Sequence, residues 1–207
     1  MKRIRSAEST YTKRAVYHES DFFWEPDDPY EGKGWNNYQS KKKKKFVPPK
    51  PRYISEIPLG NGKKIFMAPC PMSSSSLFSN DDDYILHFLK EGVGTVVLML
   101  EEKSLISWYE NWGLNVIHIP IRDFSIPKDL GSFDKSLHLV RKKLNRHNVL
   151  FHCMGGNGRT GLVVASMFVQ MGMEPDKAIK MVRKYRKEAI ETREQEDFIF
   201  EYYDILY

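Results

Sequence analysis

A glycine-rich loop around one cysteine constrains this chain of 207 residues more than any other stretch. The loop runs from His152 to Gly161. Before it, residues 148–151 form an apolar run typical of a buried strand, and after it residues 162–171 have helical spacing. Backbone N–H groups at a helix N-terminus have no intrahelical partners, and the helix dipole favours negative charge there. The sequence therefore predicts an anion-binding loop between a strand and a helix.

The residue types in this loop predict a phosphate site with a covalent nucleophile. Cys153 is expected to be a thiolate, because cysteines near helix N-termini and cations have lowered pKa values, and the thiolate is the attacking form. Arg159 can bind two phosphate oxygens in parallel and orient the phosphorus. Thr160 is expected to donate its hydroxyl to the sulfur. His152 is expected to hold the loop through ring hydrogen bonds rather than to transfer protons.

Five residues between the cysteine and the arginine are expected to surround the anion. They are Met154, Gly155, Gly156, Asn157 and Gly158. The glycines allow the backbone to turn its N–H groups inward, because no Cβ obstructs a tetrahedral anion. The five include no lysine. Since basic residues usually bind a highly charged inositol headgroup, this composition disfavours a phosphoinositide substrate.

The order of histidine, cysteine, five residues, arginine, threonine and glycine resembles the signature of the cysteine-dependent protein tyrosine and dual-specificity phosphatases. From Lys64 onward the chain is most similar to the atypical dual-specificity group that includes the kinase-associated phosphatase. The shared features are the paired glycines of the loop, the Ala-Pro-Cys turn at 68–70, the Pro-Ile-Arg-Asp segment at 120–123 and the Ala-Ile-Glu-Thr run at 189–192. The resemblance implies hydrolysis of phosphotyrosine in proteins, with phosphoserine and phosphothreonine as further candidates, through a phosphocysteine intermediate.

Asp123 is the first candidate for the general acid. The departing oxygen needs a proton, so a carboxylic acid must reach it from outside the loop. Asp123 follows an apolar strand and stands between Pro120 and Pro127, a setting that resembles the general-acid loop of the family. The alternatives are a turn-forming aspartate or a salt bridge with the neighbouring arginine. Asp129 is the reserve candidate.

Two further residues have two interpretations each. By the family resemblance, Gln195 would orient the water that hydrolyses the phosphocysteine; the alternative is an exposed glutamine in the first turn of the last helix. Cys70 is either a buried apolar residue or a redox partner that forms a reversible disulfide with Cys153. The two cysteines are too few for a disulfide framework or a four-cysteine zinc site, and no metal or organic cofactor is expected.

Strands alternate with helices in residues 56–207, which predict the catalytic domain. Strands are expected at 64–67, 95–100, 114–119 and 148–151, and helices at 80–92, 103–111, 133–146, 159–172, 175–188 and 193–206. This alternation predicts an α/β fold whose central, mainly parallel sheet is flanked by helices. The cysteine loop is expected at the carboxyl end of a strand.

Residues 1–55 predict a basic, aromatic-containing N-terminal extension. The net charge of the chain is +5, and the whole positive excess lies in the first 60 residues. Lys41–Lys45 indicate a solvated linker or, alternatively, a contact with an anionic partner or a nuclear import receptor. The segment 17–38 is too aromatic for a typical solvated tail, so it is expected to pack on the catalytic domain or to dock a partner.

Composition and charge also bear on location and on the competing functions. The sequence has no apolar run long enough for a transmembrane segment and no secretory signal, and a cysteine nucleophile favours the reducing cytoplasm or nucleus. The leading prediction is a phosphatase whose partner is a phosphoprotein substrate. The alternatives are an RNA 5′-triphosphatase, a phosphoinositide phosphatase and a non-catalytic phosphoprotein-binding module.

Overall fold

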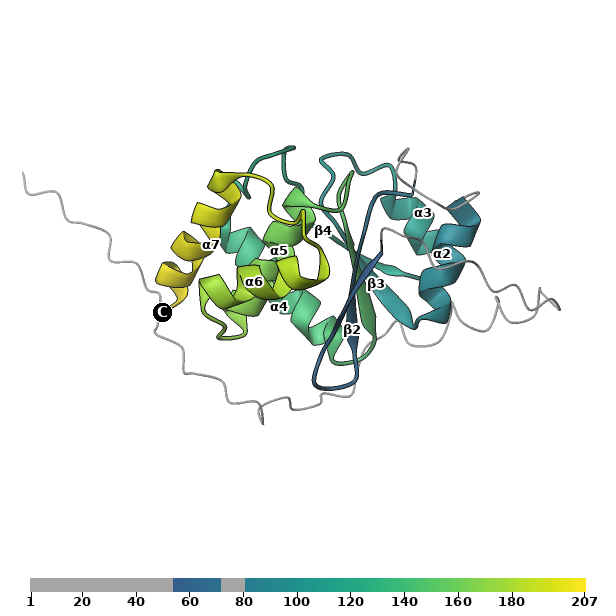
Figure 1. The fold of residues 1–207 in the computed structure, drawn as a ribbon. Coiled ribbons are helices and arrows are strands. Elements are labelled where there is room, and N and C mark those ends of the chain that lie inside the picture. The colour runs from purple at the N-terminus through teal and green to yellow at the C-terminus, as the bar shows by residue number, and fades with distance from the viewer. Residues whose placement is uncertain (1–53, 72–80) are drawn as a thin grey trace, which may run out of the picture.

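The computed structural model describes residues 54–71 and 81–207, which form a sheet covered by helices on both faces (Figure 1). In these residues five strands pair in the order β1-β2-β5-β3-β4. Their bounds are β1 Ser55–Pro58, β2 Lys64–Ala68, β3 Val93–Leu98, β4 Asn115–His118 and β5 Asn148–His152. Only β1 runs antiparallel to its neighbour among the strands described, so the predicted, mainly parallel sheet is confirmed.

Helices cover the two faces unequally. Their bounds are α2 Asp81–Lys90, α3 Ile106–Asn111, α4 Leu130–Leu144, α5 Gly158–Gln170, α6 Pro175–Tyr185 and α7 Arg193–Leu206. Figure 1 shows α2 and α3 on one side of the sheet and α4 to α7 on the other. None of the helices in the described residues combines the length and the apolar content that crossing a membrane requires.

Several predicted boundaries were wrong. Strand β1, Ser55–Pro58, was not predicted. Helix α4 begins at Leu130 rather than 133, because the Asp129 side chain accepts the Ser132 N–H and caps the helix there. Helix α3 begins three residues later than predicted, β3 begins and ends two residues earlier, and α6 ends at Tyr185. The predictions for residues 1–53 and 72–80, Lys41–Lys45 among them, lie outside the described residues.

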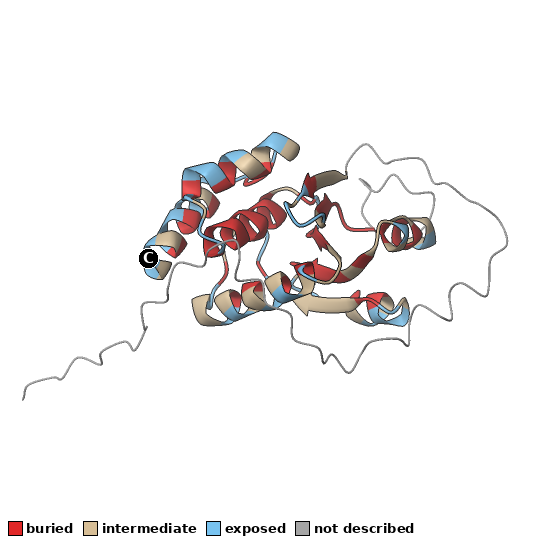
Figure 2. Ribbon diagram, turned by 90° about the horizontal axis from the view of Figure 1, so that it is seen from below, coloured by how far each residue is buried: buried red, intermediate tan, exposed pale blue. Residues whose placement is uncertain are grey.

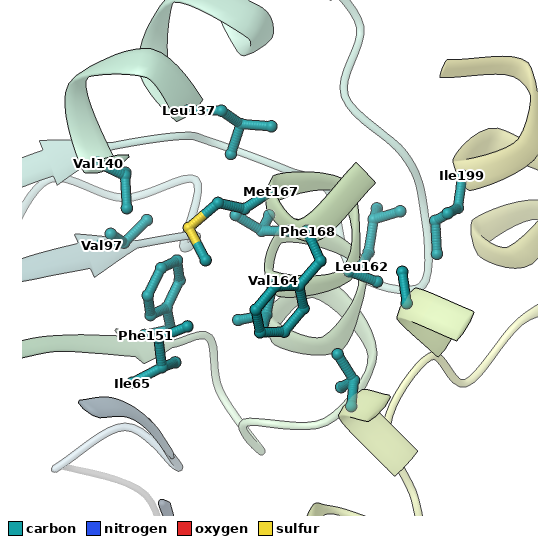
Figure 3. Close-up of a cluster of buried hydrophobic side chains, with 14 of the residues drawn as sticks. Ile65, Val97, Leu137, Val140, Phe151, Leu162, Val164, Met167, Phe168 and Ile199 are labelled. Carbon is teal, nitrogen blue, oxygen red and sulfur yellow. The ribbon is translucent and has the colours of Figure 1, made fainter. Parts of the chain in front are cut away.

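Helix α5 is the centre of the larger hydrophobic core. All of its residues are buried, and Figure 2 shows it buried along its whole length while α7 exposes its outer side. Met167 of α5 faces Phe151 and Val97 of the sheet, and Leu162 lies on the side of α5 toward Ile199 of α7 (Figure 3). A second core, which includes Phe66 and Tyr109, packs between the other face of the sheet and helices α2 and α3. Because both ends of α5 are fixed by this packing, its N-terminus is a rigid support for a site.

Candidate active site

Cys153 lies directly after the central strand β5 and before the first turn of α5. The last residue of β5, His152, pairs with Ala68 on one side and with Leu98 on the other, so strands flank the cysteine on both sides. The Cys153 side chain is buried, and its Sγ accepts the Gly156 N–H at 3.2 Å. The predicted junction of strand, loop and helix is therefore present, with a backbone donor aimed at the sulfur.

Gly156 allows the loop to lie against the end of β2. Its φ of +74° is in the left-handed region that glycine adopts readily. A Cβ at this position would lie 2.3 Å from the Ala68 carbonyl oxygen, so any side chain would collide with backbone. Next to this contact, the Cys70 N–H donates to the Met154 carbonyl oxygen at 2.9 Å. The loop is thus supported from behind by the residues that follow β2.

Arg159 occupies the first turn of α5 and is almost completely buried. Its Nη1 donates to the Ile121 carbonyl oxygen at 3.2 Å, and its Nη2 forms an ion pair with Asp123 Oδ1 at 2.8 Å. Within the described part of the chain, the buried Arg159 Nε has no hydrogen-bond partner. A buried donor without a partner is costly, so this N–H is available to an anion bound in the loop.

Thr160 is placed at the site but does not make the predicted bond. Its buried Oγ1 has no hydrogen-bond partner among residues 54–71 and 81–207, so the expected donation to the Cys153 sulfur is absent there. The nearest backbone donor satisfies the sulfur instead, because the Gly156 N–H already points at it. Among the described residues, Thr160 Oγ1 is therefore a second buried polar atom without a hydrogen-bond partner, as Arg159 Nε is.

Of the two acid candidates, the structure brings Asp123 to the site. Asp123 lies beyond β4, and its side chain is 60% exposed while it contacts the buried Arg159. Asp129 instead caps α4, and the Ser132 N–H lowers the pKa of its carboxyl by stabilising the charged form. Asp123 does form a salt bridge, as the alternative interpretation predicted, but its partner is Arg159 of the cysteine loop and not the neighbouring Arg122.

Gln195 is fully buried, so the alternative of an exposed glutamine was wrong. With Thr192 it forms a capping box at the start of α7. Its Oε1 accepts the Glu191 N–H at 2.9 Å, and its Nε2 donates to the Ser125 carbonyl oxygen at 3.3 Å. A Cβ at Gly158 would lie 3.1 Å from the same Oε1, so the amide of Gln195 lies against the cysteine loop. Gln195 therefore connects α7 with the loop that carries Asp123.

His152 holds the loop through both ring nitrogens, as expected. Nδ1 lies 3.1 Å from the Cys153 carbonyl oxygen, and Nε2 lies 2.7 Å from the Tyr109 hydroxyl. Burial lowers the pKa of His152 to about 4, although the hydrogen bond to Cys153 opposes this shift. The ring is thus neutral near pH 7, with Nδ1–H donating to the carbonyl and Nε2 accepting from Tyr109.

This neutral, buried histidine predicts acid sensitivity. The unfolded chain binds a proton at His152 below about pH 6.5, whereas the folded chain binds it only near pH 4, so acid favours unfolding between these values. We expect His152 to remove as much as about 3 kcal/mol of stability between pH 6.5 and 4. The measurement is urea unfolding at a series of pH values for the wild type and for His152→Asn. An equally steep loss in the variant would contradict the prediction, and His138→Asn, whose side chain is 42% exposed, is the control.

Sequence reasoning missed Arg186. This arginine follows α6 and is 9% exposed. Its Nε donates to Asn157 Oδ1 at 2.6 Å and its Nη2 to the Gly155 carbonyl oxygen at 2.9 Å. Burial lowers the pKa of Arg186, while the charges of Cys153 and Glu191 oppose this shift. Arg186 therefore braces the outer side of the loop, and no spacing in the sequence connects it with residues some thirty positions earlier.

Cys70 is buried in the second hydrophobic core, as its first interpretation predicted. It and Cys153 are both thiols, and the Cys70 backbone is linked to the residue after Cys153 by the bond to Met154. The redox interpretation stays a prediction.

Comparison with known proteins identifies the family. The model of the Swiss Army Knife protein, DSP-PTPase phosphatase domain, matches residues 67–199. The chain belongs to this phosphatase domain family. An uncharacterized protein of Methanocaldococcus jannaschii is 33% identical over 120 residues, which cover 55% of this chain and 79% of that protein. Cyclin-dependent kinase inhibitor 3 of Rattus norvegicus is 33% identical over 107 residues, half of each chain. PRL-1 phosphatase of Drosophila melanogaster is 27% identical over 54% of this chain and 64% of its own.

Solved structures show the same fold. Kinase associated phosphatase, with its catalytic-site cysteine replaced by serine, superposes with a TM-score of 0.64 at 23% identity, covering 77% of this chain and 98% of the other. Tk-PTP in its active form gives a TM-score of 0.60 at 24% identity over 72% and 97% of the two chains. The family model and the fold together assign this chain to the dual-specificity phosphatase family. This family has atypical members such as the kinase associated phosphatase.

Proposed function

We propose that this protein hydrolyses phosphotyrosine in proteins, and phosphoserine or phosphothreonine as well, through a phosphocysteine intermediate. The observation that carries the proposal is the placement of Arg159. Its buried guanidinium contacts Asp123 at 2.8 Å and keeps an unpartnered Nε, at the N-terminus of the helix that follows Cys153. A nucleophile, a bidentate cation and an acid therefore converge, and phosphate binding alone would require neither the first nor the last.

In the first step the Cys153 thiolate attacks phosphorus, and the S–P bond forms as the bond to the substrate oxygen breaks. Arg159 and the loop N–H groups stabilise the negative charge on the transferred phosphoryl group. Asp123 donates a proton to the departing oxygen, so that a neutral hydroxyl leaves. The exposed position of Asp123 suits this role. The leaving oxygen is part of a side chain of the substrate protein, which remains in solvent outside the site, so the acid must lie at the surface.

In the second step water cleaves the S–P bond and regenerates the thiolate. Asp123, now ionised, accepts a proton from the water. Gln195 is the candidate to orient this water, since its amide lies against Gly158. One of its two N–H groups donates to the Ser125 carbonyl oxygen, and the other is the one that would bind the water. Both roles of Asp123 depend on the contact that keeps it beside Arg159.

The test of this function is phosphate release from four substrates under reducing conditions. They are a phosphotyrosine peptide, a phosphothreonine peptide, a phosphoinositide and RNA with a 5′-triphosphate. We expect phosphate release to be fastest from the phosphotyrosine peptide. If only the RNA or only the lipid were hydrolysed, the substrate would be that molecule and not a phosphoprotein. The absence of any turnover would favour the phosphoprotein-binding module.

Asp123→Asn tests the mechanism within the same assay. The variant keeps the size of the side chain but cannot donate or accept the proton, so we expect kcat for an alkyl phosphate ester to fall by about 10²-fold or more. The loss should shrink for an aryl ester with a good leaving group, which needs less protonation. Asp129→Asn is the matched control, because Asp129 only caps α4. Equal losses in the two variants would exclude Asp123 as the acid.

A further inference from the structure

Glu191 contacts the phosphate loop, and neither the family signature nor the mechanism above assigns it a role. Its Oε2 accepts the Gly158 N–H at 2.9 Å. Gly158 begins α5, so this N–H is one of the helix N-terminal donors that bind anions. A Cβ at Gly158 would lie 2.3 Å from the same oxygen, so the glycine allows the carboxylate to approach the loop this closely. A fixed negative charge therefore lies at the edge of the site for a negatively charged substrate.

The backbone around Glu191 is held firmly. The preceding residue, Ile190, has a φ of +63°, a left-handed conformation that is rare for a β-branched side chain and persists only when its surroundings impose it. Arg183 donates to the Ile190 carbonyl oxygen at 2.9 Å, and the Glu191 N–H donates to Gln195. These contacts point to a built position for the carboxylate rather than to a mobile surface side chain.

The charges around the entrance of the site are unevenly distributed. Two cations that contact the loop or Asp123, namely Arg159 and Arg186, are buried. Two carboxylates that contact Arg159 or Gly158, namely Asp123 and Glu191, are exposed. A single phosphoryl group that enters the loop reaches the cations, whereas any further phosphate that stays at the entrance faces the carboxylates.

We propose that Glu191 determines the charge selectivity of the site and excludes substrates with additional phosphate groups next to the reacting one. This inference rests on the proposed phosphatase function and narrows its substrate class to isolated phosphoryl groups on a protein chain. Repulsion between like charges near a protein surface is strong enough for such discrimination. The same carboxylate favours a phosphorylated residue that has a basic neighbour.

Glu191→Gln isolates the charge. Glutamine has nearly the same size, and its Oε1 can still accept the Gly158 N–H, so the loop keeps its support. Glu194→Gln is the matched control, because Glu194 is also exposed and lies three residues after Glu191, in the first turn of α7. Melting temperatures of the three full-length proteins verify that each variant is folded.

The decisive measurement is calorimetric affinity for inorganic phosphate and for tripolyphosphate. We expect Glu191→Gln to raise the ratio of the affinity for tripolyphosphate to the affinity for phosphate by about tenfold, and this increase to diminish at high salt. Glu194→Gln should change this ratio by less than about twofold. An unchanged ratio in Glu191→Gln, or an equal change in Glu194→Gln, would overturn the inference.

Turnover separates this inference from the proposed function. For the wild type we expect a higher kcat/KM for a phosphotyrosine peptide with an adjacent arginine than for one with an adjacent glutamate, and Glu191→Gln should reduce this preference. If the wild type turned over neither peptide, the proposed function would fail. The binding ratio would still decide the role of Glu191, since it requires no catalysis.

Discussion

Replacing Cys153 with serine is expected to reduce phosphate release from phosphotyrosine peptides by at least about 10⁴-fold. A serine hydroxyl is not ionised near neutral pH, and no base beside it in the described structure replaces the lost thiolate. The fold should persist, because the smaller oxygen still fits the buried position and can accept the Gly156 N–H. The measurement combines steady-state kinetics with a thermal unfolding curve.

Mass spectrometry of the acid-quenched reaction adds a direct observation. Wild-type protein mixed with substrate should carry one phosphoryl group on the peptide that contains Cys153, and the serine variant should carry none. Cys70→Ser is the control, since Cys70 is equally buried but outside the loop, and its activity should remain close to that of the wild type. Substantial turnover by Cys153→Ser would mean that another group is the nucleophile.

Replacing Arg159 with lysine should lower kcat/KM by about 10³-fold. The guanidinium contacts Ile121 and Asp123 through separate nitrogens, and its Nε has no hydrogen-bond partner among the described residues. A lysine has a single nitrogen, so it cannot hold Asp123 and bind two phosphate oxygens at once. The charge is conserved, and the loss therefore measures geometry rather than net charge.

Arg193→Lys provides the control for this substitution. Arg193 is 92% exposed and pairs only loosely with Asp197, so its replacement should change kcat/KM by less than about twofold. A loss below about tenfold in Arg159→Lys would contradict the bidentate role. Guanidinium ion added to the assay should restore part of the activity of Arg159→Lys and none of that of Cys153→Ser.

Local patterns in the sequence were sufficient for the fold and for the position of the cysteine loop between a strand and a helix. The apolar run before Cys153 predicts a strand with no reference to the rest of the chain, and the glycines predict a tight turn at the following helix. Residues 148–152 form β5, one residue longer than predicted, and α5 begins at Gly158, one residue before the predicted start. The parallel sheet follows from the alternation of such runs, because parallel neighbours need crossover helices.

Contacts between distant segments were beyond such reasoning. The ion pair of Asp123 with Arg159, the brace from Arg186 and the bond from Gly158 to Glu191 join residues that only the fold brings together. The edge strand β1 escaped prediction for a different reason. It has four residues, it ends in Pro58, and strands of that length carry little periodicity.

The segment 191–195, which leads into α7, has a consequence for the order in which the site is completed during synthesis. It supports both sides of the site, since Thr192 and Gln195 contact the backbone of the loop that carries Asp123, and Glu191 contacts the loop that follows Cys153. Ribosomes produce this segment after every other part of the site, so a nascent chain that already contains Cys153 and Arg159 still lacks the supports of Asp123. The supports of Asp123 are therefore complete only when α7 has folded.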